Sequence, residues 1–323
     1  MEEDKTLLSI KDLSVQFNTV DMGECKAVNH VSLDLKEGET LGLVGETGAG
    51  KTTIALSILG LLQSPPGKIM NGQILYKGED LLKKNKKQMR KIRGEEIAMV
   101  FQDPMTALNP CDRVGDQIAE MIYLHQKVSK KEAMEKAADM MEMVGISRDR
   151  YREYPHQFSG GMKQRVIIAM ALSCDPKILL ADEPTTALDV TIQAQVLEMM
   201  KDLIKKKGTS VLLITHDLGV VAQMCERVAV IYAGEIVEYG TAEDIFDRTA
   251  HPYTMGLFGA LPGYDADSDR LHPIPGLMPN PSKLPSYCKF ADRCGKCTKQ
   301  CKEGSPELKE IEPGHFVRCY LAQ

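Results

Sequence analysis

Hydrophobic and polar residues alternate near the start of the chain and later give way to short apolar runs. Apolar residues occupy every second position over 13–17 and again over 31–35, a period that is typical of strands with one buried face. Further along, continuous apolar runs predict fully buried strands; they lie at 41–44, 97–101, 178–182 and 211–215. Because helical patterns separate these runs, we expect an α/β fold built around a parallel sheet.

The pattern changes twice in the second half of the chain. Between about 112 and 175 it is purely helical, which predicts an inserted helical subdomain. From Leu261 onward prolines become frequent and the alternation of strands and helices stops. We therefore expect a first domain over 1–262 and a small C-terminal extension over 263–323.

Composition and charge exclude several functions. The 323 residues include 45 acidic and 40 basic side chains, for a net charge of −5, which is the wrong sign for a protein that binds nucleic acid by neutralising phosphates. The acidic N-terminus lacks the basic and apolar regions of a signal peptide, so we do not expect export. The longest apolar stretches are shorter than the ~20 residues that a spanning helix needs. Any attachment to a membrane should therefore go through a partner.

A glycine-rich segment predicts a phosphate site. Residues 45–52 read GETGAGKT, which fits G-x4-G-K-[ST], and they stand between a predicted buried strand and a helical pattern. In such a loop backbone N–H groups point at phosphate oxygens, Lys51 reaches the β- and γ-phosphates, and the Thr52 hydroxyl binds Mg²⁺. The predicted nucleotide-binding residues here are Gly45, Glu46, Thr47, Gly48, Ala49, Gly50, Lys51, Thr52 and Thr53.

Two carboxylates follow another predicted buried strand. Asp182 ends the run 178–182, and Glu183 comes directly after it. An acidic residue at the end of a strand beside a phosphate loop can hold Mg²⁺, which we expect of Asp182. Glu183 would extend beyond the strand and activate the attacking water as a general base.

Four further motifs carry a resemblance to the ATP-binding cassette (ABC) family. They are FSGGMKQR at 158–165, which resembles the family's signature loop, Gln102 in VFQDP, TALD at 186–189 and His216 in ITHD. The resemblance covers residues 7 to about 245. It implies a P-loop ATPase core made of a β subdomain, a RecA-like parallel sheet and a helical subdomain.

In this family two cassettes pack head to tail around ATP, so the resemblance assigns residues to two sides of the nucleotide. Ser159, Gly160 and Gly161 should contact the ATP held by the other subunit. The residues expected to act within their own subunit are Lys51, Thr52, Gln102, Asp182, Glu183 and His216. Among these, His216 should bond the γ-phosphate, and Gln102 should link Mg²⁺ and the attacking water to the transmembrane partner. An aromatic residue before the phosphate loop stacks on adenine in this family, and Phe17 is the candidate for it. The alternative is that Phe17 is only a core residue of its strand.

The C-terminal extension is rich in cysteine. A set of four thiols in a reducing compartment favours a metal site, and the four are Cys288, Cys294, Cys301 and Cys319, with Cys297 as a fifth thiol. Zinc is supported by the C-x2-C spacing of Cys294 and Cys297. Reduced cysteines without a metal stay open as well. We expect a metal here to be structural, since the extension is too short for a good core.

The extension also resembles the C-terminal region of ATP-binding subunits of oligopeptide and dipeptide importers. The motifs that carry this resemblance are HPYT at 251–254, IPG at 274–276, C-x-F-x-x-R-C at 288–294 and EPGH at 312–315. With FSGGM at 158–162, they match the D-type subunit. In some members the corresponding cysteines bind a [4Fe–4S] cluster, which implies the ligands Cys288, Cys294, Cys301 and Cys319 and leaves Cys297 outside the set.

The resemblance implies an ATPase that uses ATP and Mg²⁺ to drive uptake of dipeptides or oligopeptides. Its partners would be a sister ABC ATPase in a heterodimer (or a second copy in a homodimer), two permeases and an extracytoplasmic solute-binding protein, with no nucleic acid. The chain would sit at the cytoplasmic face of the membrane. Nickel or another small solute is an alternative cargo. A DNA-repair type of ABC ATPase would need a long insertion between Lys51 and Ser159, where 108 positions leave no room.

Overall fold

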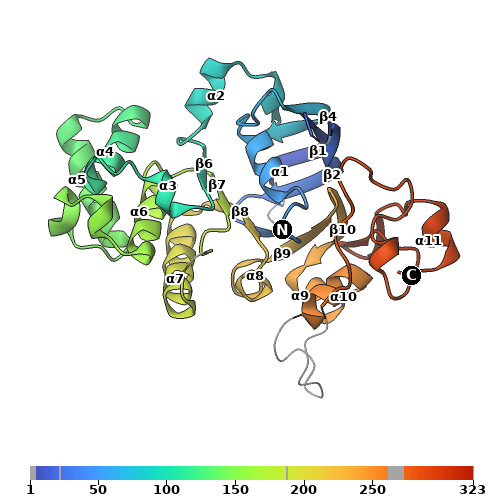
Figure 1. Cartoon of the computed structure of the whole chain (residues 1–323). Helices are drawn as coiled ribbons and strands as arrows, with labels where there is room; N and C mark the ends of the chain where they lie inside the picture. The colour runs from blue at the N-terminus through green and yellow to red at the C-terminus, as the bar shows by residue number, and fades with distance from the viewer. Residues whose placement is uncertain (1–4, 22, 187, 261–272, 323) are drawn as a thin grey trace. The chain divides into compact units, whose positions relative to one another are not determined.

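The structure is a computed structural model that describes residues 5–21, 23–186, 188–260 and 273–322. The chain forms two compact units (Figure 1). We call one the helical unit, which consists mainly of Leu35–Thr40 and Lys83–Ile214. The other, the sheet unit, consists of Thr6–Asp34, Leu41–Leu82 and the described part of Thr215–Gln323.

The sheet unit begins with antiparallel strands. β1 (Thr6–Thr19) pairs antiparallel with β4 (Gly67–Tyr76), which pairs with the short β5 (Glu79–Asp80). On its other edge β1 neighbours β2 (Gly23–Lys36). The alternation of buried and exposed residues in β1 and β2 confirms the period of two that the sequence shows there, because one face of these strands packs inward.

A second group of strands in the sheet unit supports the phosphate loop. β3 (Thr40–Val44) runs parallel to β9 (Arg227–Tyr232), and β9 continues through an antiparallel turn into β10 (Glu235–Thr241). Every residue of β3 is buried, as its continuous apolar run predicts. The helices of this unit are α1 (Lys51–Ile58), α8 (Leu218–Met224), α9 (Ala242–Asp247) and α10 (Pro252–Gly259).

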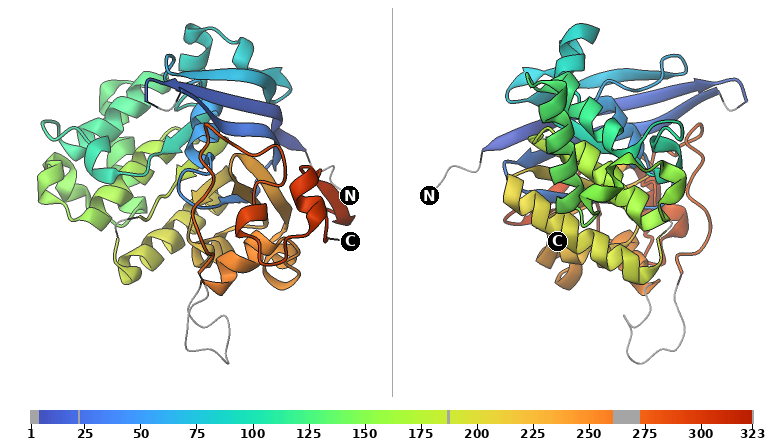
Figure 2. Two further views of the ribbon diagram at one scale, coloured as in Figure 1. Left: turned by 45° about the vertical axis from the view of Figure 1, so that its right-hand side comes forward. Right: turned by 90° about the vertical axis from the view of Figure 1, so that its left-hand side faces the viewer.

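The C-terminal extension adds strands that the sequence did not predict. β12 (His315–Val317) pairs antiparallel with β10, and β11 (Lys309–Glu312) pairs with β12. The extension also contains the 3-10 turn η4 (Ala291–Arg293) and the short helix α11 (Lys299–Glu303). Its chain passes the β2 strand, where the Lys26 N–H donates to the Pro281 carbonyl at 2.9 Å (Figure 2). Strands of three and four residues carry little sequence signal, because so few positions cannot show a period of two.

The helical unit contains a parallel group of three strands, and helices surround it. β7 (Ile178–Asp182) lies between β6 (Ile97–Val100) and β8 (Ser210–Thr215), and both pairings are parallel. β7 and β8 are buried throughout, as expected for apolar runs in a sheet covered on both faces.

The regular elements between 112 and 175 are all helical (Figure 1). The 3-10 turn η1 (Leu81–Lys83) stands where the sheet unit's segment Leu41–Leu82 ends. The helices of the helical unit are α2 (Lys86–Ile92), α3 (Pro104–Ala107), α4 (Val114–His125), α5 (Lys130–Met143), η2 (Arg148–Arg152), η3 (Pro155–Gln157), α6 (Gly160–Leu172) and α7 (Val190–Lys207). Of the described helices, none is both long enough and apolar enough to cross a membrane.

Candidate functional site

The glycine-rich segment forms a tight loop between β3 and α1. Two of its glycines are required by close contacts, because a Cβ on Gly45 would stand 2.2 Å from the Ile231 carbonyl oxygen. A Cβ on Gly50 would stand 2.4 Å from the Ala27 oxygen, and Gly50 also has a φ of 106° that favours glycine. Gly50 is the N-cap of α1, so the positive end of this helix lies at the loop.

Lys51 lies inside this loop. Its side chain is buried, and Nζ donates to the carbonyl oxygens of Gly45 at 2.6 Å and of Glu46 at 3.0 Å. Thr47, Gly48 and Thr52 are exposed, and Thr53 is half-buried. The predicted loop residues are therefore brought together around one cationic nitrogen, which is the arrangement needed to hold the phosphates of a nucleotide.

In the helical unit the structure brings two predicted residues together. Gln102 follows β6, and its Nε2 donates to the Glu183 Oε2 at 2.8 Å. The Thr186 hydroxyl donates to the same oxygen at 2.9 Å. Asp182, the last residue of β7, is buried beside this group.

The backbone at Glu183 is unusual. Its φ is +47°, a left-handed conformation that costs a residue with a side chain roughly 1 kcal/mol or more. The Glu183 N–H donates to the Ile214 carbonyl at 2.7 Å, and the residue is 7% exposed. The sharp turn after β7 thus ends the strand at Asp182 and turns the carboxylate of Glu183 toward Gln102.

The signature segment begins a helix. Ser159 is the N-cap of α6, and its hydroxyl accepts a hydrogen bond from the Met162 N–H at 3.4 Å. Ser159 and Gly160 are exposed. A Cβ on Gly161 would stand 2.4 Å from the Ile192 Cγ2, so α7 approaches closely here. The exposed start of this 13-residue helix is the end that carries positive partial charge, which can attract an anion.

Three further predicted residues occupy separate places. His216 is exposed between β8 and α8. Phe17 is half-buried in β1 opposite Gly67, where a Cβ would lie 3.0 Å from the ring. Of the segment 186–189, Asp189 is the N-cap of α7 and accepts from the Ile192 N–H at 3.0 Å, whereas Ala187 lies outside the described residues.

The cysteines of the extension lie near one another. Cys301 is buried, and the Cys288 N–H donates to its carbonyl at 3.2 Å. Burial, with smaller contributions from the neighbouring Cys301, Cys319 and Cys294, raises the pKa of the Cys288 thiol to about 11. The pKa of Cys297 is also raised, first by burial and then by Cys301. Cys294, Cys301 and Cys319 are thus close enough to Cys288 to affect its pKa, and Cys301 is close enough to Cys297 to affect that of Cys297.

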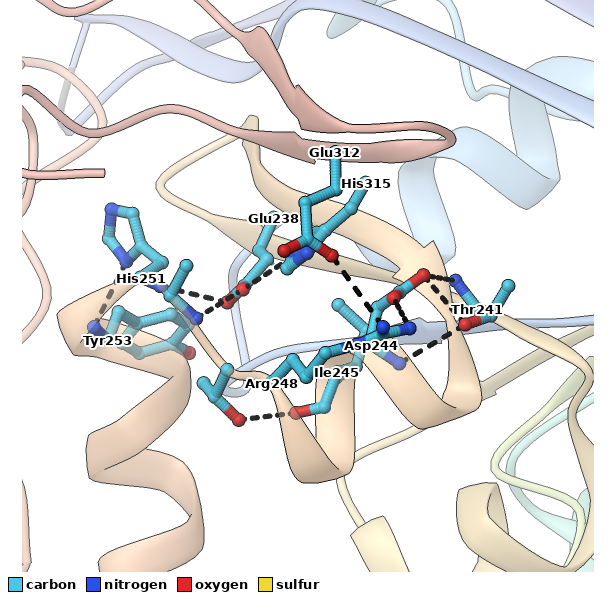
Figure 3. A network of polar contacts seen from close by, with 11 residues as sticks. Glu238, Thr241, Asp244, Ile245, Arg248, His251, Tyr253, Glu312 and His315 are labelled. Atoms are coloured by element: carbon cyan, nitrogen blue, oxygen red, sulfur yellow. Dashed lines mark hydrogen bonds and ion pairs between the residues drawn. The ribbon is translucent and has the colours of Figure 1, made fainter. Parts of the chain in front are cut away.

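A buried polar network joins the extension to β10 and α10 (Figure 3). The Glu238 carboxylate on β10 is fully buried and accepts from His315 Nε2 at 3.0 Å. It also accepts from the backbone N–H groups of Ala250 at 2.7 Å and His251 at 3.2 Å. His251 in turn is the N-cap of α10, and its Nδ1 accepts from the Tyr253 N–H at 3.0 Å. The network therefore fixes where α10 begins.

Two residues near the phosphate loop were not predicted as functional. The Tyr253 hydroxyl oxygen accepts a hydrogen bond from the Glu46 N–H at 3.0 Å, and Arg293 forms an ion pair with the Glu46 carboxylate at 2.9 Å. Tyr253 belongs to the motif HPYT and Arg293 to C-x-F-x-x-R-C, which the sequence analysis used only to recognise the family resemblance. Membership of these motifs could have indicated that the two residues are functional, but their spacing in the sequence does not show that they contact Glu46.

Comparison with known proteins decides the family. The family description "ABC transporter" matches residues 28–186, and "Oligopeptide/dipeptide transporter, C-terminal region" matches residues 237–301. The chain is 49% identical to the oligopeptide transport ATP-binding protein AppD of Bacillus subtilis, over 98% of this chain and 97% of that protein. The chain belongs to the ABC transporter family. It is also 50% identical to the dipeptide transport ATP-binding protein DppD of B. subtilis, over 98% of this chain and 94% of that protein.

Solved structures support the same fold. A dimeric, post-hydrolysis state of an ATP-binding cassette bound to ADP and Pi aligns with a TM-score of 0.65 and 28% identity, over 73% of this chain and 98% of that one. The CbiO1 protein of Clostridium perfringens, part of an ABC transporter complex, aligns with a TM-score of 0.65 and 26% identity, over 75% of this chain and 91% of that one. The expected ABC ATPase fold is thereby confirmed.

Proposed function

We propose that this chain is the ATP-hydrolysing subunit of an importer of dipeptides or oligopeptides. The observation that carries the proposal is similarity to such subunits over nearly the whole chain. Besides AppD and DppD of B. subtilis, the oligopeptide transport ATP-binding protein OppD of Escherichia coli is 46% identical over 97% of this chain and 93% of that protein. Residues 237–301 match the oligopeptide/dipeptide transporter C-terminal region, so the similarity extends beyond the ATP-binding cassette itself.

ATP binding is assigned to the loop before α1. The backbone N–H groups of 45–53 and the Lys51 ammonium would hold the phosphates, and the Thr52 hydroxyl would bind Mg²⁺. The two carbonyl contacts that Lys51 makes support this role, because they keep the ammonium inside the loop. Phe17 is the proposed adenine platform.

Hydrolysis is assigned to the group at the end of β7. Asp182 would hold Mg²⁺, and Glu183 would take a proton from the attacking water, because its carboxylate is oriented by two donors, Gln102 and Thr186. Gln102 would also bind Mg²⁺ and the water, and His216 would bond the γ-phosphate. Most of the rate enhancement would come from neutralising the charge of the phosphoryl group in transit.

A second cassette is required to complete each nucleotide site. Ser159, Gly160 and Gly161 carry an outward-facing anion site without a metal ligand of their own, so they would contact the nucleotide held by the facing subunit. We propose a sister ATPase as the partner, with a homodimer as the alternative. A dimeric cassette is among the structures to which this chain is similar.

A groove in the helical unit supports attachment to permeases. It has a volume of about 520 Å³ and is formed by α4, α5 and the residues just before α4. Apolar side chains line it, among them Tyr123, Leu124 and Met134, together with three acidic residues, Asp112, Asp116 and Glu120, and one basic residue, Lys130. An amphipathic helix with apolar and basic residues is complementary to this surface. Two permeases docked in this way would hold the chain at the cytoplasmic face of the membrane, and a solute-binding protein would deliver the peptide from outside.

We also propose a domain boundary at 262/263 and a helical subdomain over 112–175.

A metal in the C-terminal extension is a further part of the proposal. The thiols of Cys294, Cys301 and Cys319 are near enough to Cys288 to raise its pKa, which supports a shared [4Fe–4S] group, and such a group would cross-link a segment with little core of its own. Zinc stays the alternative because Cys297 stands beside Cys301. Iron and sulfide analysis of anaerobically purified protein, with absorbance near 400 nm, supports the cluster; stoichiometric zinc in colourless protein contradicts it.

Uptake by the assembled transporter tests the function. The chain is co-expressed with its sister ATPase and permeases, reconstituted in vesicles with the solute-binding protein, and supplied with radiolabelled dipeptide, oligopeptide or Ni²⁺. We expect ATP-dependent peptide uptake that Lys51→Ala abolishes and Lys302→Gln leaves unchanged, since Lys302 is an exposed residue of α11. Uptake of Ni²⁺ without peptide would replace the proposed cargo.

A further inference from the structure

The phosphate loop is held from the C-terminal side of the chain through one residue, Glu46. The Glu46 carboxylate is 31% exposed, and Arg293 Nη1 donates to both of its oxygens, at 2.9 and 3.1 Å. The Arg293 side chain is only 8% exposed. An ion pair this shielded from solvent restricts both partners more than a surface pair does.

Arg293 is itself fixed by contacts that do not involve Glu46. Its Nε donates to the Pro275 carbonyl at 2.9 Å, and its guanidinium lies 5.7 Å from the ring centre of Tyr232. Arg293 ends η4, one position before Cys294. The guanidinium is therefore held by Pro275 and Tyr232 independently of Glu46.

The backbone of Glu46 is restrained as well. Its N–H donates to the hydroxyl oxygen of the fully buried Tyr253 at 3.0 Å, and its carbonyl accepts from Lys51. Tyr253 packs against Tyr232 and Phe290, with ring centres 4.6 and 5.4 Å apart. The Glu238–His251 network fixes the start of the helix that carries Tyr253 (Figure 3).

The chain that leads to Arg293 also passes over the loop. A Cβ on Gly48 would lie 3.3 Å from the Met278 Cε, so the Met278 side chain lies close to the tip of the loop. Residues of the C-terminal extension and of α10 thus contact 46–48 at the side chain, the backbone and the tip.

From these contacts we propose that Arg293 is a positioning residue for nucleotide binding. By holding Glu46, it keeps the loop in the conformation that receives phosphates, so that ATP affinity depends on the folded C-terminal extension. The inference rests on the proposed assignment of ATP to this loop. The effect falls on binding rather than on hydrolysis, because Arg293 contacts no residue assigned to the attack of water.

Nucleotide titration of the full chain in the assembled transporter tests the proposal. We use a fluorescent N-methylanthraniloyl ATP with Mg²⁺ and measure KM and kcat of ATP hydrolysis in parallel. Loss of a charged hydrogen bond predicts that Arg293→Gln raises the dissociation constant and KM about 5- to 30-fold with kcat nearly unchanged. The dissociation constant of Arg293→Lys should lie between those of the wild type and Arg293→Gln, because lysine keeps the charge but not the guanidinium contacts.

A second variant, Glu46→Gln, covers the case in which Arg293→Gln unfolds the extension. In Glu46→Gln, Arg293 keeps its contacts with Pro275 and Tyr232 and loses only the ion pair. If the two side chains act through each other, the double variant binds no more weakly than either single variant. The matched control is Lys302→Gln in the same extension. Wild-type affinity in both single variants would overturn the positioning role. If Lys51→Ala also bound like wild type, the ATP site itself would be misassigned.

Discussion

The amide of Gln102 donates to the carboxylate of Glu183 at 2.8 Å, although the two residues are 81 positions apart. The contact orients the carboxylate that we assign to activation of water, and Thr186 adds a second donor to the same oxygen. Because Glu183 also adopts a left-handed backbone, its side chain is directed by the local turn as well as by its partners.

Replacement of Glu183 by glutamine should separate binding from hydrolysis. The amide has nearly the same shape but cannot accept a proton, so we expect ATP to bind while turnover falls by about 10²- to 10⁴-fold. Glu198→Gln on the exposed face of α7 is the control. Phosphate release by the assembled transporter measures the effect, and a Glu183→Gln transporter with near-normal turnover contradicts the assignment.

Alanine at Gly50 should damage the phosphate loop more than alanine at another left-handed glycine. Gly50→Ala combines a φ of 106° with a Cβ 2.4 Å from the Ala27 oxygen, and we expect a loss of about 2–4 kcal/mol in unfolding free energy together with loss of ATP binding. Gly208→Ala has a positive φ but open space, so only about 1 kcal/mol should be lost. Urea unfolding of both variants measures the difference; equal losses would show that the contact is easily relieved.

Ser159→Ala should affect stability and turnover separately. Loss of the N-cap of α6 should cost about 1 kcal/mol. Ser129→Ala removes the N-cap of α5 and should cost a similar amount. Only Ser159→Ala should also lower ATP hydrolysis in the assembled transporter, because the hydroxyl would contact nucleotide in the facing subunit. A parallel loss of turnover in both variants would indicate a purely structural role.

His251 should make stability depend on acidity. Burial lowers the pKa of His251 to about 3, whereas an unfolded histidine titrates near 6.5. Between these values the unfolded chain binds a proton that the folded chain does not, so the unfolding free energy decreases by about 1 kcal/mol for each unit by which the pH falls. His251→Asn keeps a capping acceptor and should remove this contribution. Chemical unfolding of both proteins from pH 7 to pH 4.5 gives the two slopes, and identical slopes would show that His251 titrates normally.

The groove beside α4 should be needed for assembly. Leu124 is 65% exposed there, and Leu124→Asp places a fourth carboxylate on the apolar surface. We expect the variant to lose most co-purification with permeases while it keeps its thermal stability, because an exposed side chain contributes little to the core. Leu61→Asp, a change at an exposed leucine of the sheet unit, is the control. Normal recovery of permeases with Leu124→Asp would exclude this groove as their docking site.

Much of this protein follows from local sequence. The apolar runs of β3, β7 and β8 predict buried strands, because a strand covered on both faces excludes polar side chains from its whole length. The glycines of 45–50 predict a phosphate loop, because the turn requires residues without a Cβ at Gly45 and Gly50. Ser159 before a helical pattern similarly predicts an N-cap and its anion site.

Contacts between distant segments needed the tertiary structure. Arg293 and Glu46 are 247 positions apart, and no periodicity relates them. Their meeting depends on the packing of the extension against β10 and on the buried Glu238, which fixes α10 and with it Tyr253. Hydrophobic pattern and turn chemistry act over a few residues along the chain, whereas the partner of a charged side chain is chosen by which surfaces the folded elements bring within reach.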